Sequence, residues 1–562
     1  MVMLFSASVE SEKLSSAEWP TAGSREKAGH VVSPAGGYPL RIDGQDIGSV
    51  RENQLHGRVV LMNPTPALIE MIASKPGVTS IEMRAQGTLT EVNVASISLD
   101  RSPPDWTLLG FEDERVLLAM LNLVARFEQS CRLTIGGPIT FQQALGAIRG
   151  SRVSSMRWMY SSHIPSIESA LPNQIEVGDH QLEVLEYGGM GSPSDLNIIL
   201  TLPSLVSLDM SRCVVSQEWA PESCDGTYKV DELTLPTGTK LSQRVLSFLK
   251  RFDELRSLSL TNSDLDGRLA EVASISSITD LSIKSCSGYD TRDLETLFET
   301  LKLRKMEVGP SGSLLGGFRK VVPVLDASVL KSALKQPQLE ELLLNTPING
   351  DITLGFTPRC DALVSLTLAH VVDSAFLKTL GLKASLSALN VIVAKAECLQ
   401  YIIANMPNLR DARITIGGQA SPHGEIARLS ELKSLSSLFL RGDFSNAGDD
   451  LAAIAAIPSL CSLRLYSTLP ATLPANIDWG HALQVISMSK YICGDSLKEL
   501  IERDQLLSIT LVSVGTEDES LYDLLAKTHM IRHLRLYGTS DNAAIAARAL
   551  KSRLSWADVH VA

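Results

Sequence analysis

Side chains that commonly carry out chemistry are spread thinly along this sequence. Ten histidines occur, but none forms an HExxH pattern or a Cys/His cluster at zinc spacing. Neither a GxSxG elbow nor a kinase motif set is present. The glycine-rich segment at residues 309–320 lacks the GK followed by Ser or Thr that a phosphate-binding loop needs. We therefore predict no metal and no cofactor, and we interpret residues 309–320 as a surface loop.

One cysteine has a neighbouring aspartate that could support nucleophilic chemistry, since Cys493 is followed by Gly494 and Asp495. Asp495 is also well placed as the N-cap of a helix expected over residues 495–503. No CxxC pair occurs among the cysteines, which is typical of reduced thiols in an intracellular protein. The other seven are Cys131, Cys213, Cys224, Cys286, Cys360, Cys398 and Cys461.

A repeated pattern, LxxLxL, organises most of the chain. Its middle apolar position recurs eighteen times between Leu133 and Ala557, and fifteen of the seventeen intervals are 23 to 26 residues long. In each copy the last two apolar residues are two positions apart, so an extended strand directs both to one side. Between the copies the spacing becomes helical, as at residues 241–252, 291–301, 396–405, 495–503, 520–527 and 542–551.

Each copy thus predicts a strand followed by a helix or helical turn, and one copy cannot bury its apolar side alone. The pattern resembles the leucine-rich-repeat family over at least residues 130–562. This resemblance implies an α/β solenoid shaped like a horseshoe, with a parallel sheet on the concave face and helices on the convex face.

The resemblance has one departure at the residue that follows each strand. The family often has Asn or Cys there, bonded to backbone groups inside the turn. This chain has Cys at only two of these positions, so we expect irregular curvature. The residues are Cys213, Ser263, Cys286, Pro347, Asp443, Thr468, Tyr491 and Thr539.

The ends of the chain differ from its middle. We interpret residues 1–52, rich in Ser, Gly, Glu and Lys, as a flexible leader. Residues 53–129 form either degenerate repeats or an N-terminal cap, with a strand triplet at Val78, Ile81 and Met83 and helices over residues 66–74 and 112–127. Residues 130–562 form the array of about 18 repeats, which we expect to reach the last residue without a further domain.

The Cys-x-Asp sequence at Cys493 is similar to the catalytic motif of bacterial ubiquitin ligases that carry leucine-rich repeats. In that family the motif belongs to a separate helical domain after the repeats. Here it lies between the strand triplets of Ile486 and Ile509, so we favour the helix-cap interpretation and predict that the chain is not an enzyme.

Strand residues between the inward apolar positions are expected to line the concave face. In the first half these are small or acidic, at Glu186, Asp209, Glu232, Asp280, Glu307 and Glu341. Arg, Tyr and Trp are enriched at binding hot spots, and they gather in the last part. We predict a partner-binding strip there, of Phe439, Arg441, Arg464, Tyr466, His533, Arg535, Tyr537 and Trp556.

A simpler interpretation of these residues stays open. They could be ordinary exposed strand residues, with aromatic rings stacked on neighbouring strands and Trp556 covering the end of the core. The sequence alone does not separate the two interpretations.

The predicted function is a non-catalytic scaffold that binds another protein on its concave face. The net charge of −12 and pI near 5.4 argue against nucleic acid or an anionic membrane as partner. No secretory signal or membrane span is evident, so we expect a cytoplasmic protein. Two alternatives are a substrate-recognition subunit of a ubiquitin ligase, although no F-box is found in residues 1–130, and a secreted bacterial effector that binds a host protein.

Overall fold

The structure is a computed structural model. It describes residues 40–43, 57–85, 89–99, 103–127, 129–159, 180–189, 193–213, 219–220, 227–310, 323–350, 352, 358–380, 386–417, 424–469, 471, 473–474, 477–489, 495–512, 523–537, 550, 554 and 558–561.

One parallel sheet of 22 strands runs through the described chain. Each strand between the end strands β1 and β24 pairs with the strand before it and the strand after it, as for Leu258, Leu281 and Met306. The strands are β1 (Leu40–Asp43), β2 (Gly57–Met62), β3 (Val78–Arg84), β4 (Asp105–Leu109), β5 (Cys131–Gly136), β6 (Val153–Met159), β7 (Val184–Gly188), β8 (Ser207–Asp209), β9 (Glu232–Thr234), β10 (Ser257–Thr261), β11 (Asp280–Lys284), β12 (Lys305–Gly309), β14 (Glu341–Leu344), β16 (Ser365–Val372), β17 (Ala388–Val393), β18 (Asp411–Ile416), β19 (Ser437–Gly442), β20 (Ser462–Ser467), β21 (Val485–Ser489), β22 (Ser508–Val512), β23 (His533–Tyr537) and β24 (Asp558–Val561).

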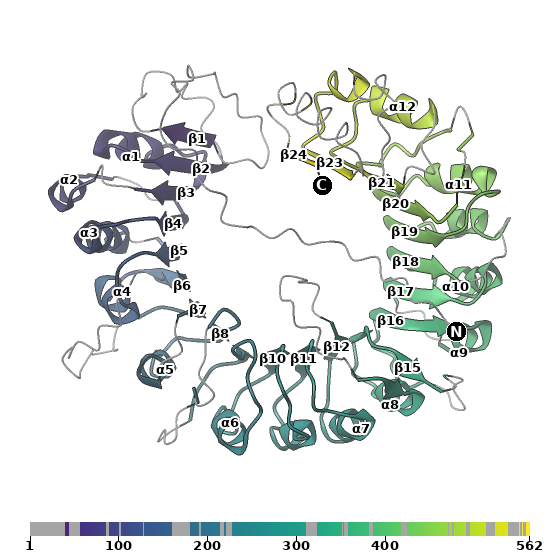
Figure 1. Ribbon diagram of the computed structural model, residues 1–562, viewed down its shortest axis with the longest axis horizontal. Helices are drawn as coiled ribbons and strands as arrows, with labels where there is room; N and C mark the ends of the chain where they lie inside the picture. The colour runs from purple at the N-terminus through teal and green to yellow at the C-terminus, as the bar shows by residue number, and fades with distance from the viewer. Residues whose placement is uncertain are drawn as a thin grey trace.

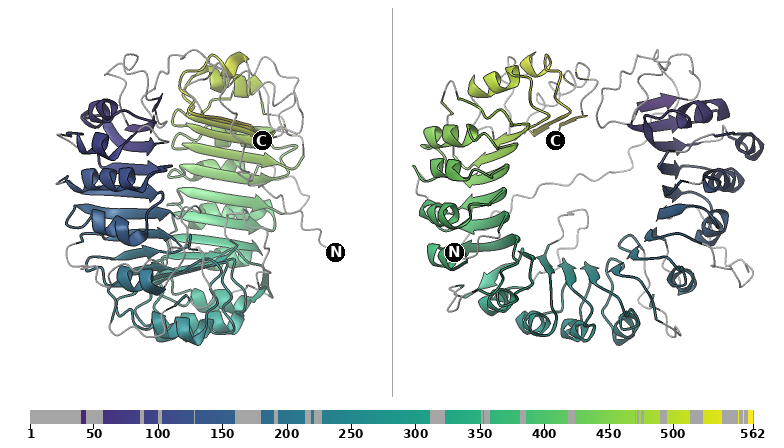
Figure 2. Two further views of the ribbon diagram at one scale, coloured as in Figure 1. Left: turned by 60° about the vertical axis from the view of Figure 1, so that its left-hand side comes forward. Right: turned by 180° about the vertical axis from the view of Figure 1, so that it is seen from behind.

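Helices cover the outer side of this sheet, and the whole forms an open ring (Figure 1). Views from two other directions show the strands stacked along the inner wall (Figure 2). The short strands β13 (Leu325–Asp326) and β15 (Ile348–Asn349) pair separately. The outer helices are α1 (Pro66–Ala73), α2 (Glu91–Ala95), α3 (Glu114–Ala125), α4 (Phe141–Ala147), α5 (Pro193–Leu200), α6 (Gln243–Leu249), η3 (Leu269–Ser274), α7 (Thr291–Thr300), α8 (Ala327–Ala333), α9 (Ser374–Leu380), η4 (Ala396–Cys398), α10 (Leu399–Asn405), η5 (Ala427–Glu431), α11 (Gly448–Ala455) and α12 (Asp495–Glu502).

The strand register follows the sequence repeat almost throughout. Every middle position from Leu133 to Leu534 pairs with the corresponding position of the next copy. The predicted middle position of the last copy, Ala557, was wrong, because Leu534 pairs with Val559. Positions two apart in sequence fall on the same side of an extended strand, so a two-residue shift leaves the predicted alternation unchanged.

The same sheet continues on the N-terminal side of residue 130. Ile81 of the expected triplet pairs with Val59 of β2 and with Trp106 of β4, and Trp106 pairs with Leu133. Strand β1 lies at residues 40–43, inside the range interpreted as a leader, and pairs with β2. The ring therefore contains strands in both N-terminal ranges.

The core is the layer between the sheet and the helices. Leu258, Leu260 and Leu281 have 2% or less of their surface exposed, and the same alternation recurs along the ring. Helix α7 illustrates how the outer elements begin. Asp290 accepts a hydrogen bond from the N–H of Asp293 at 3.0 Å, and the Asp293 side chain accepts one from the Asp290 N–H at 3.1 Å. This reciprocal cap satisfies backbone donors that the first helical turn leaves unpaired.

The turns after the strands use several side chains in place of a regular asparagine ladder. The Cys213 thiol donates to the Tyr187 carbonyl at 3.0 Å, and Cys286 donates to the Leu260 carbonyl at 3.5 Å. The Thr468 hydroxyl donates to the Gly442 carbonyl at 3.2 Å. Cysteine and threonine thus bond the preceding repeat, each with its own geometry. Tyr491 and Thr539 lie outside the described residues.

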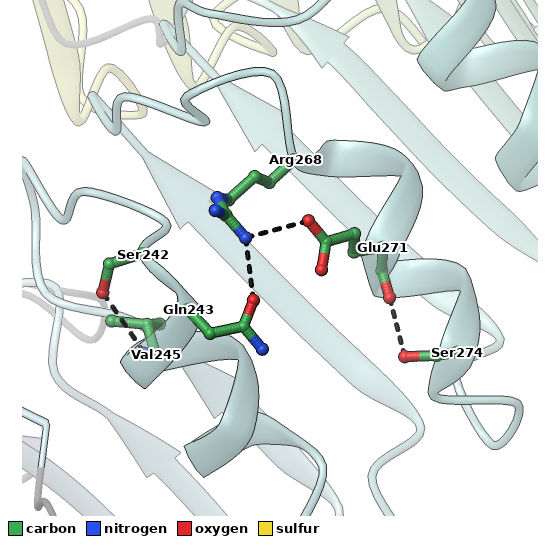
Figure 3. A network of polar contacts seen from close by, with 6 residues as sticks. All are labelled: Ser242, Gln243, Val245, Arg268, Glu271 and Ser274. Carbon is green, nitrogen blue, oxygen red and sulfur yellow. Dashed lines mark hydrogen bonds and ion pairs between the residues drawn. The ribbon is translucent and has the colours of Figure 1, made fainter.

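Polar contacts on the convex side also join adjacent repeats. Arg268 donates to Gln243 of α6 at 2.8 Å and to Glu271 of η3 at 3.0 Å (Figure 3). One guanidinium group therefore connects two consecutive outer elements, in the nearest-neighbour manner of a solenoid.

Candidate binding surface on the concave face

The predicted strip residues lie on three strands, except for Trp556, which is outside the described residues. In β19, β20 and β23, three strands of the inner wall of the ring (Figure 1), they alternate with buried leucines. Phe439 and Arg441 belong to β19, and Arg464 and Tyr466 to β20. Strand β23 contributes His533, Arg535 and Tyr537. The three arginines are exposed, and the three aromatic rings are half-buried.

Strands β19 and β20 bring two of the aromatic residues together. Phe439 is in register with Arg464, and Arg441 with Tyr466. The Phe439 and Tyr466 ring centroids are 5.3 Å apart with the rings tilted by 33°, a separation typical of an attractive aromatic pair. The Tyr466 hydroxyl is also 2.7 Å from the Ser487 hydroxyl of β21. The pair therefore fits the simpler interpretation of stacked rings and, equally, a rigid anchor for a partner.

The residues of β23 stand apart from this pair. Across β20 to β23, Arg464 pairs in register with Ser487, Ser487 with Thr510, and Thr510 with Arg535. Three strand steps of about 4.8 Å separate the two arginines, which is about 14 Å in all. The strip is therefore two groups with a region of small side chains between them.

Arg413 of β18 belongs to the same surface but was missed in the sequence. It pairs in register with Phe439 and is exposed. Its Nε lies 3.8 Å from Asp411 of its own strand. The sequence could have identified Arg413, because it follows the repeat position at Ala412 just as Arg464 follows Leu463.

None of the guanidinium groups of Arg441, Arg464 and Arg535 has an ion-pair partner among the residues that the structure describes. Moreover, no Asp or Glu occurs in the five strands β19 to β23. These strands thus contribute positive charge to the concave surface and no acidic side chain that would balance it.

The first half of the concave face is less acidic than expected, because three of its six named acids, Glu186, Glu307 and Glu341, have basic partners. Arg157 binds Glu186, Lys284 lies 2.9 Å from Glu307, and Lys305 lies 2.8 Å from Glu341. The hydrogen bond to Glu341 raises the pKa of Lys305. The expectation considered the acids alone, whereas the register places Arg157 beside Glu186 and Lys305 beside Glu341, and Lys284 reaches Glu307 from another row. These pairs satisfy one another and leave little net charge.

Glu82 is a further paired acid, at the N-terminal end of the ring. Its side chain is 4% exposed and accepts hydrogen bonds from Arg58 and, at 2.7 Å, from Arg84. Burial alone would raise the pKa of Glu82. The hydrogen bonds and positive charges of Arg58 and Arg84 have the larger combined effect, so the pKa lies below its ordinary value.

The candidates for chemistry receive no geometric support. No group of three or more His, Cys, Asp or Glu side chains that could hold a metal ion occurs in the described part of the chain. Cys493 and Gly494 lie outside it, and α12 begins at Asp495. The loop expected at residues 309–320 is described only as far as residue 310. In the described chain, no helix has the length and apolar character needed to cross a membrane.

Each sequence copy supplies one strand of a curved parallel sheet, its apolar residues stack in register, and an outer helix or turn leads to the next copy. The fold is a leucine-rich-repeat solenoid. No family model matches this chain, and no curated protein matches its sequence. Solved structures similar to the solenoid are leucine-rich-repeat proteins.

One is an internalin of Listeria monocytogenes, with 12% identity, 79% of this chain and 91% of that chain covered, and a TM-score of 0.27. A leucine-rich-repeat protein of Leptospira interrogans has 14% identity, 81% and 93% coverage, and a TM-score of 0.31. TLR13, in complex with a single-stranded RNA, has 13% identity and a TM-score of 0.32, and the match covers 88% of this chain and 64% of TLR13.

Proposed function

We propose that this protein is a non-catalytic recognition scaffold that holds another protein on the concave face of its solenoid. The contact surface in this proposal is the strip on β19, β20 and β23, with Arg413 added from β18. The observation that carries the proposal is that Arg441, Arg464 and Arg535 are exposed, have no ion-pair partner among the described residues, and lie beside half-buried aromatic residues on one sheet.

The physical reason is the energy that such residues release when a partner covers them. Phe439 and Tyr466 are held against each other, so little conformational entropy is lost on binding. Arginine and tyrosine combine a large contact area with hydrogen-bonding groups, and both are enriched among binding hot spots. The paired charges of the first half offer a partner less, because an existing ion pair must be broken before either group can bind.

Affinity capture from cell lysate tests this function. The intact chain is compared with the variant in which Arg464, Tyr466, Arg535 and Tyr537 are all replaced by Ala. We expect the intact chain to retain a specific protein and the variant to lose it. A control variant replaces Lys284 and Lys305 with Ala on the same face and should retain the protein. Equal capture by the intact chain and the strip variant would refute the proposed surface.

A further inference from the structure

Two strands of the strip carry the same four residues. Strand β20 contains Leu463-Arg464-Leu465-Tyr466, and β23 contains Leu534-Arg535-Leu536-Tyr537. In both strands the leucines are buried, the arginine is exposed and the tyrosine is half-buried. The concave face therefore presents the same arginine and tyrosine arrangement twice, at a fixed separation.

Small hydroxyl side chains occupy the two strands between these copies. Ser487 and Thr510 lie in the row that joins the two arginines. Ser487 is 4% exposed and is held by the Tyr466 hydroxyl, and Thr510 is half-buried. Arg464 and Arg535 thus lie on either side of two strands whose residues in this row have short side chains.

We propose that Arg464 and Arg535 bind one acidic segment of a partner protein together, with the segment lying across β21 and β22. This inference rests on the proposed function and names the chemistry of the partner. Guanidinium groups form paired hydrogen bonds with carboxylates, and here no carboxylate on β19 to β23 competes for them.

The separation of the arginines favours an extended segment. In an extended chain, residues four apart point to the same side and are about 13 Å apart, close to the span of about 14 Å between the arginines. In a helix, residues four apart are only about 6 Å apart. Two acidic residues at this spacing reach both arginines at once, and the second contact gains from the high local concentration that the first creates.

Overall charge favours an acidic segment of protein over nucleic acid. The whole chain carries a net charge of −12, which repels a long polyanion, whereas a short acidic segment of a protein meets only the cationic strands. Arginine beside aromatic rings also suits single-stranded nucleic acid, so the experiment includes that ligand.

The test measures binding by fluorescence anisotropy at low ionic strength with three labelled probes. These are a peptide with glutamates four residues apart, the same peptide with glutamine, and an oligothymidylate of equal length. The double variant Arg464→Gln/Arg535→Gln is compared with Lys284→Gln/Lys305→Gln, which removes the same charge from paired positions. Circular dichroism verifies that both variants fold.

We expect the glutamate peptide to bind and the glutamine peptide not to bind. The arginine variant should weaken peptide binding by about tenfold or more, and the lysine variant should not. An equal loss of peptide binding in both variants would mean that the overall charge of the protein causes the binding, and it would refute the proposed site. Tighter binding of oligothymidylate, lost in the arginine variant, would reassign the site to nucleic acid. If neither probe binds but lysate capture still depends on the strip, the acidic ligand is wrong and the scaffold function stands.

Discussion

Replacing Glu82 with Gln measures how much the buried carboxylate between Arg58 and Arg84 contributes to the stability of the fold. The carboxylate is almost fully buried, with Arg58 and Arg84 as its hydrogen-bond donors. Glutamine has nearly the same size and keeps one acceptor oxygen. However, it loses the negative charge and turns an NH₂ group toward the guanidinium groups.

The expected cost follows from these contacts. A hydrogen bond to a charged group contributes about 1.5 to 3 kcal/mol, and two such bonds lose their charge. The side chains of Arg58 and Arg84 are 53% and 43% exposed, so water recovers part of the loss. We expect Glu82→Gln to lower the free energy of unfolding at neutral pH by about 2 kcal/mol.

The lowered pKa of Glu82 also determines how the stability difference between wild type and Glu82→Gln depends on pH. The folded-state pKa of Glu82 lies below 4.5, so its contribution is complete above the unfolded pKa and is lost as pH falls through the folded value. The stability difference between wild type and Glu82→Gln should therefore be constant near neutral pH and narrow in acid.

Urea unfolding monitored by circular dichroism measures this difference, and hydrogen exchange of the β2 to β4 amides localises it. Glu340→Gln is the matched control, because Glu340 also pairs with an arginine, Arg304, but its side chain is 35% exposed, against 4% for Glu82. It should change stability little. A difference for Glu82→Gln that stays the same from neutral to acidic pH would refute the reasoning.

Two further predictions concern the core. Burial raises the pKa of Cys213 to about 12 and that of Cys131 to about 11, so neither thiol should react with an aromatic disulfide reagent in the native protein. Exposed Cys461 should react at once, and mass spectrometry of labelled peptides distinguishes the sites. Leu260→Ala removes a fully buried side chain and should cost about 2 to 5 kcal/mol. Hydrogen exchange should show the greatest loss of protection in β9 to β11, because each repeat contacts only its neighbours, and an equal loss around the whole ring would contradict this.

The repeat was predictable because its signal is local and recurs many times. The triplet of Val78, Ile81 and Met83 was identified this way and forms β3. Strand β4 was missed, since Trp106 replaces the usual aliphatic residue and two prolines precede it. Helices at residues 66–74, 112–127 and 291–301 were predicted to within a few residues of α1, α3 and α7.

The charge of the concave face was harder to predict. Arg157 and Glu186 both follow a repeat position directly, so aligning the repeats would have paired them. Lys284 and Glu307 occupy different rows, and their contact depends on how far a lysine side chain reaches across the sheet. Sequence positions alone do not contain that information. The exposure of Arg441, Arg464 and Arg535, by contrast, could be predicted from the alternation of buried and exposed residues along each strand.

The curvature of the ring has a mechanical consequence. Neighbouring strands of the 22-stranded sheet meet at a series of junctions, and its end strands, β1 and β24, lie on opposite sides of the ring's opening (Figure 1). A small rotation at every junction leaves each hydrogen bond almost unchanged, yet these rotations add up along the arc. The solenoid is therefore expected to be stiff within each repeat and flexible across its opening. The width of that opening is the dimension that a ligand can change with the least distortion of any single repeat.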